Sequence, residues 1–146
     1  ALDAAGSALA FLSNGRNLTD TPMNDDGSWE AFLLDLAGDM ISQLSFGPFA
    51  PRQGLYPEVE EVTMSRDGNS VAFRSLSDLD PGATTGGVDQ VFLFDVPSSR
   101  LRQITANPSG VFSLSLDEGG ERTAYETDGA VHLNSPAEGR DRVLLE

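Results

Sequence analysis

One phrase recurs three times along this chain, and no other feature of the sequence restricts the fold as strongly. Each copy joins a polar turn to a short run of alternating apolar residues, at 1–13 (ALDAAGSALAFLS), 65–75 (SRDGNSVAFRS) and 115–127 (SLDEGGERTAYET). The copies align on Phe11, Phe73 and Tyr125. Repetition over such distances is typical of folds that stack one supersecondary unit several times.

The turn in each copy contains aspartate and glycine. An Asp-Gly turn between short alternating runs is typical of a β-hairpin. The aspartate and glycine of each turn are Asp3/Gly6, Asp67/Gly68 and Asp117/Gly119. These pairs predict that the first and third turns are two residues longer than the second. Because these aspartates recur, we interpret them as structural residues that accept N–H bonds from the turns.

A second phrase follows each time and has the character of a paired strand. EAFLLDL at 30–36 matches QVFLFDV at 90–96 closely, and AVHLNS at 130–135 is a degraded copy. Asp35 and Asp95 end two of these strands and are interpreted as structural too. Further short strands are predicted at 40–45, 59–65, 100–105, 110–115 and 142–146.

The predicted unit is therefore four antiparallel strands, which is the blade of a β-propeller. Helix is disfavoured because 15 glycines and 8 prolines interrupt every long window. The prediction is an all-β fold of three blades: blade one at about 1–50, without its first strand, blade two at about 59–108, and blade three at about 109–146.

Three blades do not close a ring by themselves, since propellers close with roughly four to eight blades. Open sheet edges also invite pairing. We therefore expect either half of a six-bladed ring, which a second chain completes around a two-fold axis, or part of a longer propeller whose remaining blades cover these edges.

The repeat at 65–105 resembles those of TolB-like β-propellers, which are WD40-like. SRDGNSVAFRS is followed there by DQVFLFDVPSSRLRQIT, and AFLLDLAGDMISQLS in the first copy fits as well. The third copy departs from the pattern, since Asn134 replaces the aspartate and the last strand ends in Glu146. The resemblance implies a non-catalytic scaffold for protein or peptide interaction, in a periplasmic or secreted setting. The alternatives are a gating propeller domain of a serine peptidase or hydrolase, and a propeller that binds a small ligand or calcium.

The composition limits the kinds of partner that the chain can bind. The net charge of −14 repels the phosphates of nucleic acids and anionic lipids, and no apolar run is long enough to span a membrane. The absence of cysteine excludes disulfides and thiolate metal sites. The chain starts at Ala1 without methionine or signal peptide, as a processed product or a fragment would.

Candidate enzymatic residues are few. His132, the only histidine, aligns near Leu33 and Leu93 and is expected to face solvent or bond a neighbour. The chain has no G-x-S-x-G motif, so no enzymatic activity and no cofactor are predicted. Trp29 is expected to be buried between blades, and an exposed anchor for a partner is the alternative.

Calcium is the one metal for which the sequence offers candidate ligands. The equivalent loops at 20–30 and 78–89 carry Asp25, Asp26, Asp78 and Asp80, and oxygen ligands beside glycine suit calcium. Neither loop has the ligand spacing of an EF-hand. Solvated acidic loops remain the alternative interpretation.

Overall fold

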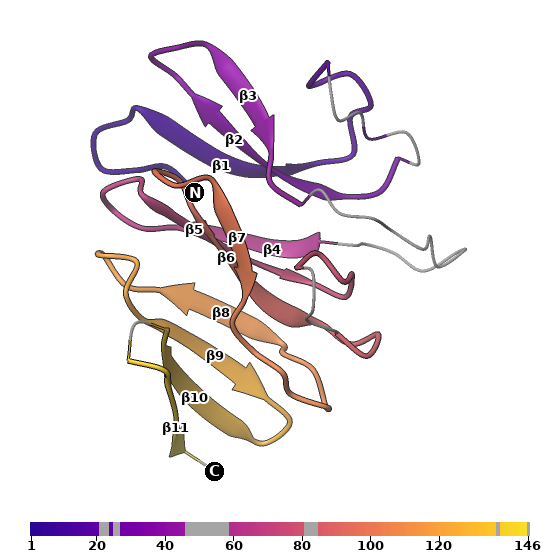
Figure 1. Cartoon of the computed structure of the whole chain (residues 1–146), viewed down its shortest axis with the longest axis vertical. Coiled ribbons are helices and arrows are strands. Elements are labelled where there is room, and N and C mark those ends of the chain that lie inside the picture. Colours follow the sequence, from indigo (N-terminus) through magenta and orange to yellow (C-terminus); the bar gives the residue numbers. More distant parts are fainter. Residues whose placement is uncertain (21–23, 25–26, 46–58, 81–84, 137, 146) are drawn as a thin grey trace.

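The computed structural model describes residues 1–20, 24, 27–45, 59–80, 85–136 and 138–145. These residues form antiparallel strands without a helix, gathered in three sheets that lie one beside the next (Figure 1). The all-β prediction and its three blades are confirmed. Among the described residues, no helix has the length and apolarity that crossing a bilayer requires.

Each sheet follows the order of its strands along the chain. Blade one contains β1 (Ala8–Ser13), β2 (Glu30–Asp35) and β3 (Met40–Gln43). Blade two contains β4 (Val59–Met64), β5 (Ser70–Ser75), β6 (Gln90–Asp95) and β7 (Arg100–Gln103). Blade three contains β8 (Ser113–Leu116), β9 (Thr123–Thr127), β10 (Ala130–Ser135) and β11 (Arg140–Leu145).

The first strand of blade one is reduced to a single bridge between Leu2 and Leu9. The same contact in blade two pairs Met64 with Val71, within a full strand.

In every blade, an aromatic side chain of the second strand stacks on an aromatic side chain of the third strand. Phe11 stacks on Phe32 with ring centroids 5.6 Å apart, and Phe73 on Phe92 at 5.8 Å. In blade three Tyr125 stacks on His132 at 4.8 Å, and the two are direct cross-strand partners. The third copy therefore keeps the pair with different side chains.

This pairing corrects two sequence alignments in blade three. His132 is equivalent to Phe32 and Phe92, not to Leu33 and Leu93, because it lies opposite Tyr125. By the same register Ser135, not Asn134, takes the place of Asp35 and Asp95. The alignment failed because a tight turn at Gly129, with φ of 82°, replaces the long loop of the other copies and removes the landmark.

The three Asp-Gly turns have equal length, so the predicted difference of two residues is wrong. Backbone bonds close them in the same way, from Asp3 N to Ala8 O, Ser65 N to Ser70 O and Asp117 N to Arg122 O. Ser65 thus occupies the place of Asp3 and Asp117, and its Oγ accepts a bond from Ser70 N. The equivalent glycines, all at positive φ, are Gly6, Gly68 and Gly120.

The repeated aspartates hold turns. Asp67 Oδ1 accepts bonds from Ser65 Oγ (2.6 Å) and Asn69 N (3.0 Å). Asp35 accepts from Ala37 N at 2.9 Å, and Asp95 accepts from Ser98 N at the same distance. Such bonds satisfy donors that a tight turn leaves without a ladder partner.

The core lies between the sheets. Phe73 and Phe92 of blade two are fully buried and pack with Ala10 and Ala31 of blade one. Tyr125 of blade three packs in a second cluster with residues of blade two. Burial of one such side chain contributes roughly 1.5–3 kcal/mol, so each aromatic residue buried between the sheets stabilises the fold.

Candidate functional site

The Asp-Gly turns of the three blades are joined into one row by backbone hydrogen bonds. Ala4 N donates to Arg66 O at 2.8 Å, and Arg66 N donates to Glu118 O at 2.9 Å. These three residues are equivalent in the repeat, so each turn contacts the next in the same way. The row brings together residues that lie more than fifty positions apart in the chain.

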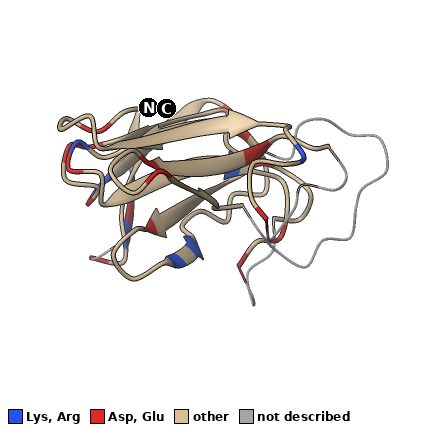
Figure 2. Ribbon diagram, turned by 90° about the horizontal axis from the view of Figure 1, so that it is seen from above, with Lys and Arg blue, Asp and Glu red and all other residues tan. Residues whose placement is uncertain are grey.

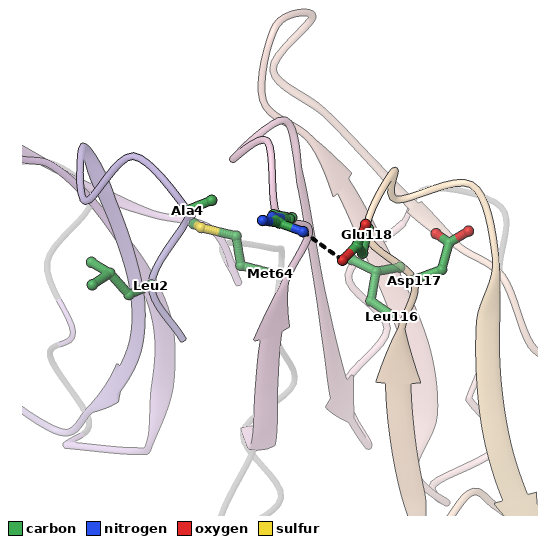
Figure 3. A pocket seen from close by; sticks show the side chains of 7 residues that line it. Leu2, Ala4, Met64, Leu116, Asp117 and Glu118 are labelled. Atoms are coloured by element: carbon green, nitrogen blue, oxygen red, sulfur yellow. Dashed lines mark hydrogen bonds and ion pairs between the residues drawn. The ribbon is translucent and has the colours of Figure 1, made fainter.

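An open pocket of about 310 Å³ lies along this row (Figure 3). Leu2, Met64 and Leu116, which occupy the same place in each repeat, contribute its apolar part. Arg66 and Glu118 contribute the polar rim and form an ion pair of 2.8 Å, with side chains 65% and 78% exposed. A pair this exposed contributes at most about 1 kcal/mol to stability, so both charges are available to a partner.

A second open pocket of about 560 Å³ adjoins the first, because both are lined by Ala4, Arg66 and Glu118. It adds the carboxylates of Asp3 and Asp67. The hydroxyl of Ser7 and the N–H of Ala8 lower the pKa of Asp3, while the Ser65 hydroxyl and Asn69 N–H lower that of Asp67. Both carboxylates are therefore ionised at neutral pH. Acidic and basic residues lie close together in the loops at the sheet ends (Figure 2).

A buried arginine, which the sequence analysis missed, ties blade two to blade three. The side chain of Arg74 is only 10% exposed and bonds Glu60 (2.9 Å), Glu61 (3.2 Å) and the carbonyl of Val111 (2.7 Å). Asp89 Oδ2 lies 3.6 Å from its Nη1. The one available signal was an arginine directly after Phe73 in an apolar strand.

Burial raises the pKa of Asp89, and the charge of Glu60 adds to this, while Arg74 acts in the opposite direction. Glu61 also accepts a bond from Leu114 N of blade three at 3.2 Å. This cluster spans the boundary between the blades and sets three carboxylates against one guanidinium. Among the described residues, the buried Asp89 Oδ1 has no hydrogen-bond partner.

His132 belongs to a cluster within blade three. Its Nε2 lies 3.1 Å from Thr127 Oγ1, and its Nδ1 lies 3.8 Å from Asp141 Oδ1. Tyr125 donates its hydroxyl to Asp141 Oδ2. Burial raises the pKa of Tyr125, and the bond to Asp141 adds to this effect. The order of hydroxyl, imidazole and carboxylate matches a hydrolytic triad, but two features differ. Thr127 is only 4% exposed, and 3.8 Å exceeds a hydrogen bond.

Two of the four calcium candidates, Asp25 and Asp26, lie outside the described residues. Asp78 Oδ1 accepts a bond from Thr85 N at 2.6 Å, and Asp80 Oδ2 accepts one from Gln103 N at 3.1 Å. In the described part of the chain, no three acidic or histidine side chains gather as a metal site would require. Calcium binding stays a prediction, which calorimetric titration with Ca²⁺ tests: no heat and an unchanged Tm would contradict it.

Trp29 was expected to be buried between blades, and this is wrong. The residue is 40% exposed and directly precedes β2. Its carbonyl accepts a bond from Val59 N, so the backbone faces blade two while the indole keeps contact with solvent.

No protein-family model and no curated protein matches this sequence. Solved structures do match. TolB from Acinetobacter baumannii has a TM-score of 0.59 at 17% identity, over 99% of this chain and 31% of that one. A putative TolB from Agrobacterium tumefaciens gives 0.60 at 15% identity, over 97% and 46%. The β-propeller domain of the Trilobed protease from Pyrococcus furiosus gives 0.58 at 11%, over 95% and 40%.

The chain thus spans less than half the length of each of these proteins. At such low sequence identities the structural similarity shows the fold alone. That fold agrees with the repeated blades, the hydrogen-bonded turns and the core between the sheets. The chain has the fold of a TolB-like β-propeller, of which it comprises three blades.

Proposed function

We propose that this chain is a non-catalytic propeller scaffold that binds a protein or peptide along the row of Asp-Gly turns. The open pocket with Leu2, Met64 and Leu116 beneath the exposed Arg66–Glu118 pair carries this proposal. An apolar floor beside a few polar groups is the usual composition of a recognition site. A segment lying across the row would place an apolar side chain on the floor and a polar group at the rim.

The charge of the site indicates the chemistry of the partner. Arg66 shares the two pockets with the carboxylates of Asp3, Asp67, Asp117 and Glu118. The whole chain carries a net charge of −14. A partner with basic residues would therefore associate faster, and its association rate would fall with added salt.

Peptide display tests the proposal without a known partner. A random peptide library is panned against the purified chain, and recovered peptides are titrated by calorimetry against Leu2→Arg and Arg66→Glu. Both side chains are exposed, so the variants should fold. We expect at least a tenfold loss of affinity for both. Arg100→Glu is the matched control, since Arg100 is an exposed arginine of β7 outside these pockets. Equal affinities for all three variants would show that the row of turns is not the binding site.

A second candidate is the gating propeller of a serine hydrolase whose catalytic part lies elsewhere in the parent protein. The likeness to the propeller domain of the Trilobed protease favours it. Sequencing the parent gene tests this candidate, which requires an α/β-hydrolase segment in the same reading frame. A frame without one would exclude it and leave the scaffold function unaffected.

The TolB resemblance also supports an extracytoplasmic setting. A fusion of the parent gene to alkaline phosphatase should be active only if the propeller is exported. An inactive but stable fusion would place the protein in the cytoplasm instead.

A further inference from the structure

The two contacts between blades are built from the same positions. Blade one contributes an aliphatic set to the first contact: Ala10, Ala31, Leu33 and Leu44. Blade two meets it with a mainly aromatic set: Val71, Phe73, Phe92, Phe94 and Leu101. In the second contact blade two supplies the equivalent aliphatic set, Ala72, Val91, Leu93 and Ile104, against residues that include Leu114 and Tyr125. Each blade thus presents an aliphatic face to the next one.

Blade three repeats the aliphatic set on the side that none of the described strands covers. Strand pairing places these residues at the equivalent positions, and they are Ala124, Val131, Leu133 and Leu145. This set is the aliphatic face of blade three. Leu145 is 69% exposed, whereas the equivalent Leu44 in blade one is 3% exposed. Blade two packs against Leu44, whereas no described blade packs against Leu145.

Blade one repeats the aromatic set on the side that no described blade covers. Register places Leu9 opposite Leu34, Phe11 opposite Phe32 and Leu34 opposite Ile41. These residues are equivalent to the mainly aromatic set that blade two packs against blade one. They form the aromatic face of blade one: Leu9, Phe11, Phe32, Leu34 and Ile41. Phe32 is already only 1% exposed, so a partner would cover the four half-buried members of this face.

We infer that a second copy of this chain covers both faces, with the aliphatic face of each copy packed on the aromatic face of the other. The chain's two uncovered faces are chemically complementary to each other, in the way that each existing contact is complementary. Two copies would then make two identical contacts around one two-fold axis and close a ring of six blades. Six lies within the range of roughly four to eight blades in which propellers close.

Charge enters this contact at the edge of the aliphatic face. Every member of both faces is uncharged, although the chain carries a net charge of −14. Arg142 lies opposite Leu133, beside the aliphatic face, as Arg102 lies opposite Leu93 in blade two. Glu126 lies opposite Val131 on the same side, where blade two carries Arg74 opposite Val91, so side chains of both signs border the aliphatic face.

Light scattering behind a sizing column tests the inference on the whole chain. We expect a single species of twice the 15.5 kDa of one chain at about 10 μM, since standard interfaces dissociate in the micromolar to picomolar range. The double variant Ile41→Arg with Leu145→Arg should elute at the mass of one chain. The control Met40→Arg should stay at the double mass, because Met40 is 64% exposed and lies opposite Asp35 on the other side of β3.

Mixing two single variants tests the head-to-tail arrangement. Ile41→Arg alters only the aromatic face, and Leu145→Glu alters only the aliphatic face. Each should be mainly monomeric alone, whereas a mixture should recover the double mass, since one contact is then unaltered and the other pairs opposite charges. A monomeric wild-type chain with native circular dichroism would overturn the inference, because other blades would then be needed. So would open polymers, or a dimer that the Ile41→Arg and Leu145→Glu variants leave intact.

Discussion

At the scale of single residues, the three turns show why one glycine matters more than its equivalents. A Cβ on Gly120 would lie 2.4 Å from Ser70 Oγ and 2.5 Å from Ser70 Cβ of the preceding blade. A Cβ on Gly68 would meet Asp3 at 3.3 Å, and one on Gly6 would meet nothing within 4 Å. The crowding comes from the neighbouring blade, since the local conformation of the three turns is the same.

Gly120→Ala should therefore destabilise the chain by about 3 kcal/mol, the sum of a strained positive φ and an overpacked contact. Gly129→Ala is the control, because Gly129 also has positive φ, of 82°, but open space around it. It should cost about 1 kcal/mol. Urea unfolding measures both. Equal losses would show that the contact between turns contributes nothing.

Ser99→Gly should stabilise the chain by about 0.5 kcal/mol, because Ser99 adopts a φ of 53° that costs an L-residue energy. Blade three already has Gly139 at the equivalent position, with φ of 60°. The thermal midpoint should rise slightly. A lower midpoint would mean that the added freedom of the unfolded chain outweighs the relieved strain.

At the scale of elements, polar contacts between blades supplement the apolar ones. Arg74 of β5 reaches Val111, just before β8, while Glu61 of β4 reaches Leu114 in β8 itself. A buried charge without partners is costly, so the whole cluster depends on all of its members. The exposed Arg66–Glu118 pair joins the same two blades but remains in solvent.

Arg74→Ala should lower the free energy of unfolding by about 3 kcal/mol, since Glu61 and Asp89 then lose their buried partner. Arg66→Ala removes an arginine of an exposed pair and should cost at most about 1 kcal/mol. Denaturant unfolding compares the two. Similar small losses would mean that water solvates the cluster around Arg74.

At the scale of the whole molecule, three stacked blades share one row of turns and leave two faces uncovered. The stability of this assembly should depend on pH through its turn aspartates. Hydrogen bonds lower the pKa of Asp3, Asp67 and Asp95 below the ordinary value of about 3.9. The unfolded chain thus binds protons at a higher pH than the folded one.

The stabilisation from these three groups is complete above the ordinary aspartate pKa and is lost as the pH falls through the folded values. Asp89 acts in the opposite direction, because its raised pKa makes its ionised form unfavourable in the folded state. With three groups against one, the urea midpoint should fall steeply below about pH 4. A midpoint that rises steadily from pH 5 to pH 3 would contradict this.

Sequence alone determined the strands and their repetition. Alternation of apolar residues and turns with aspartate and glycine are local properties, so every strand from β1 to β11 lies where its phrase predicts. The resemblance of the repeat to TolB-like propellers rested on the same local letters. Function was not determined this way, because no catalytic or cofactor motif accompanies the repeat.

Tertiary structure decided which residues are equivalent and which of them meet. Ser65 replaces an aspartate and His132 replaces a phenylalanine, and only hydrogen bonding and strand register identify them. The burial of Arg74 and the pocket beneath Arg66 and Glu118 depend on blades that are remote in the chain. Contacts of this kind arise when sheets stack, so no local pattern in the sequence encodes them.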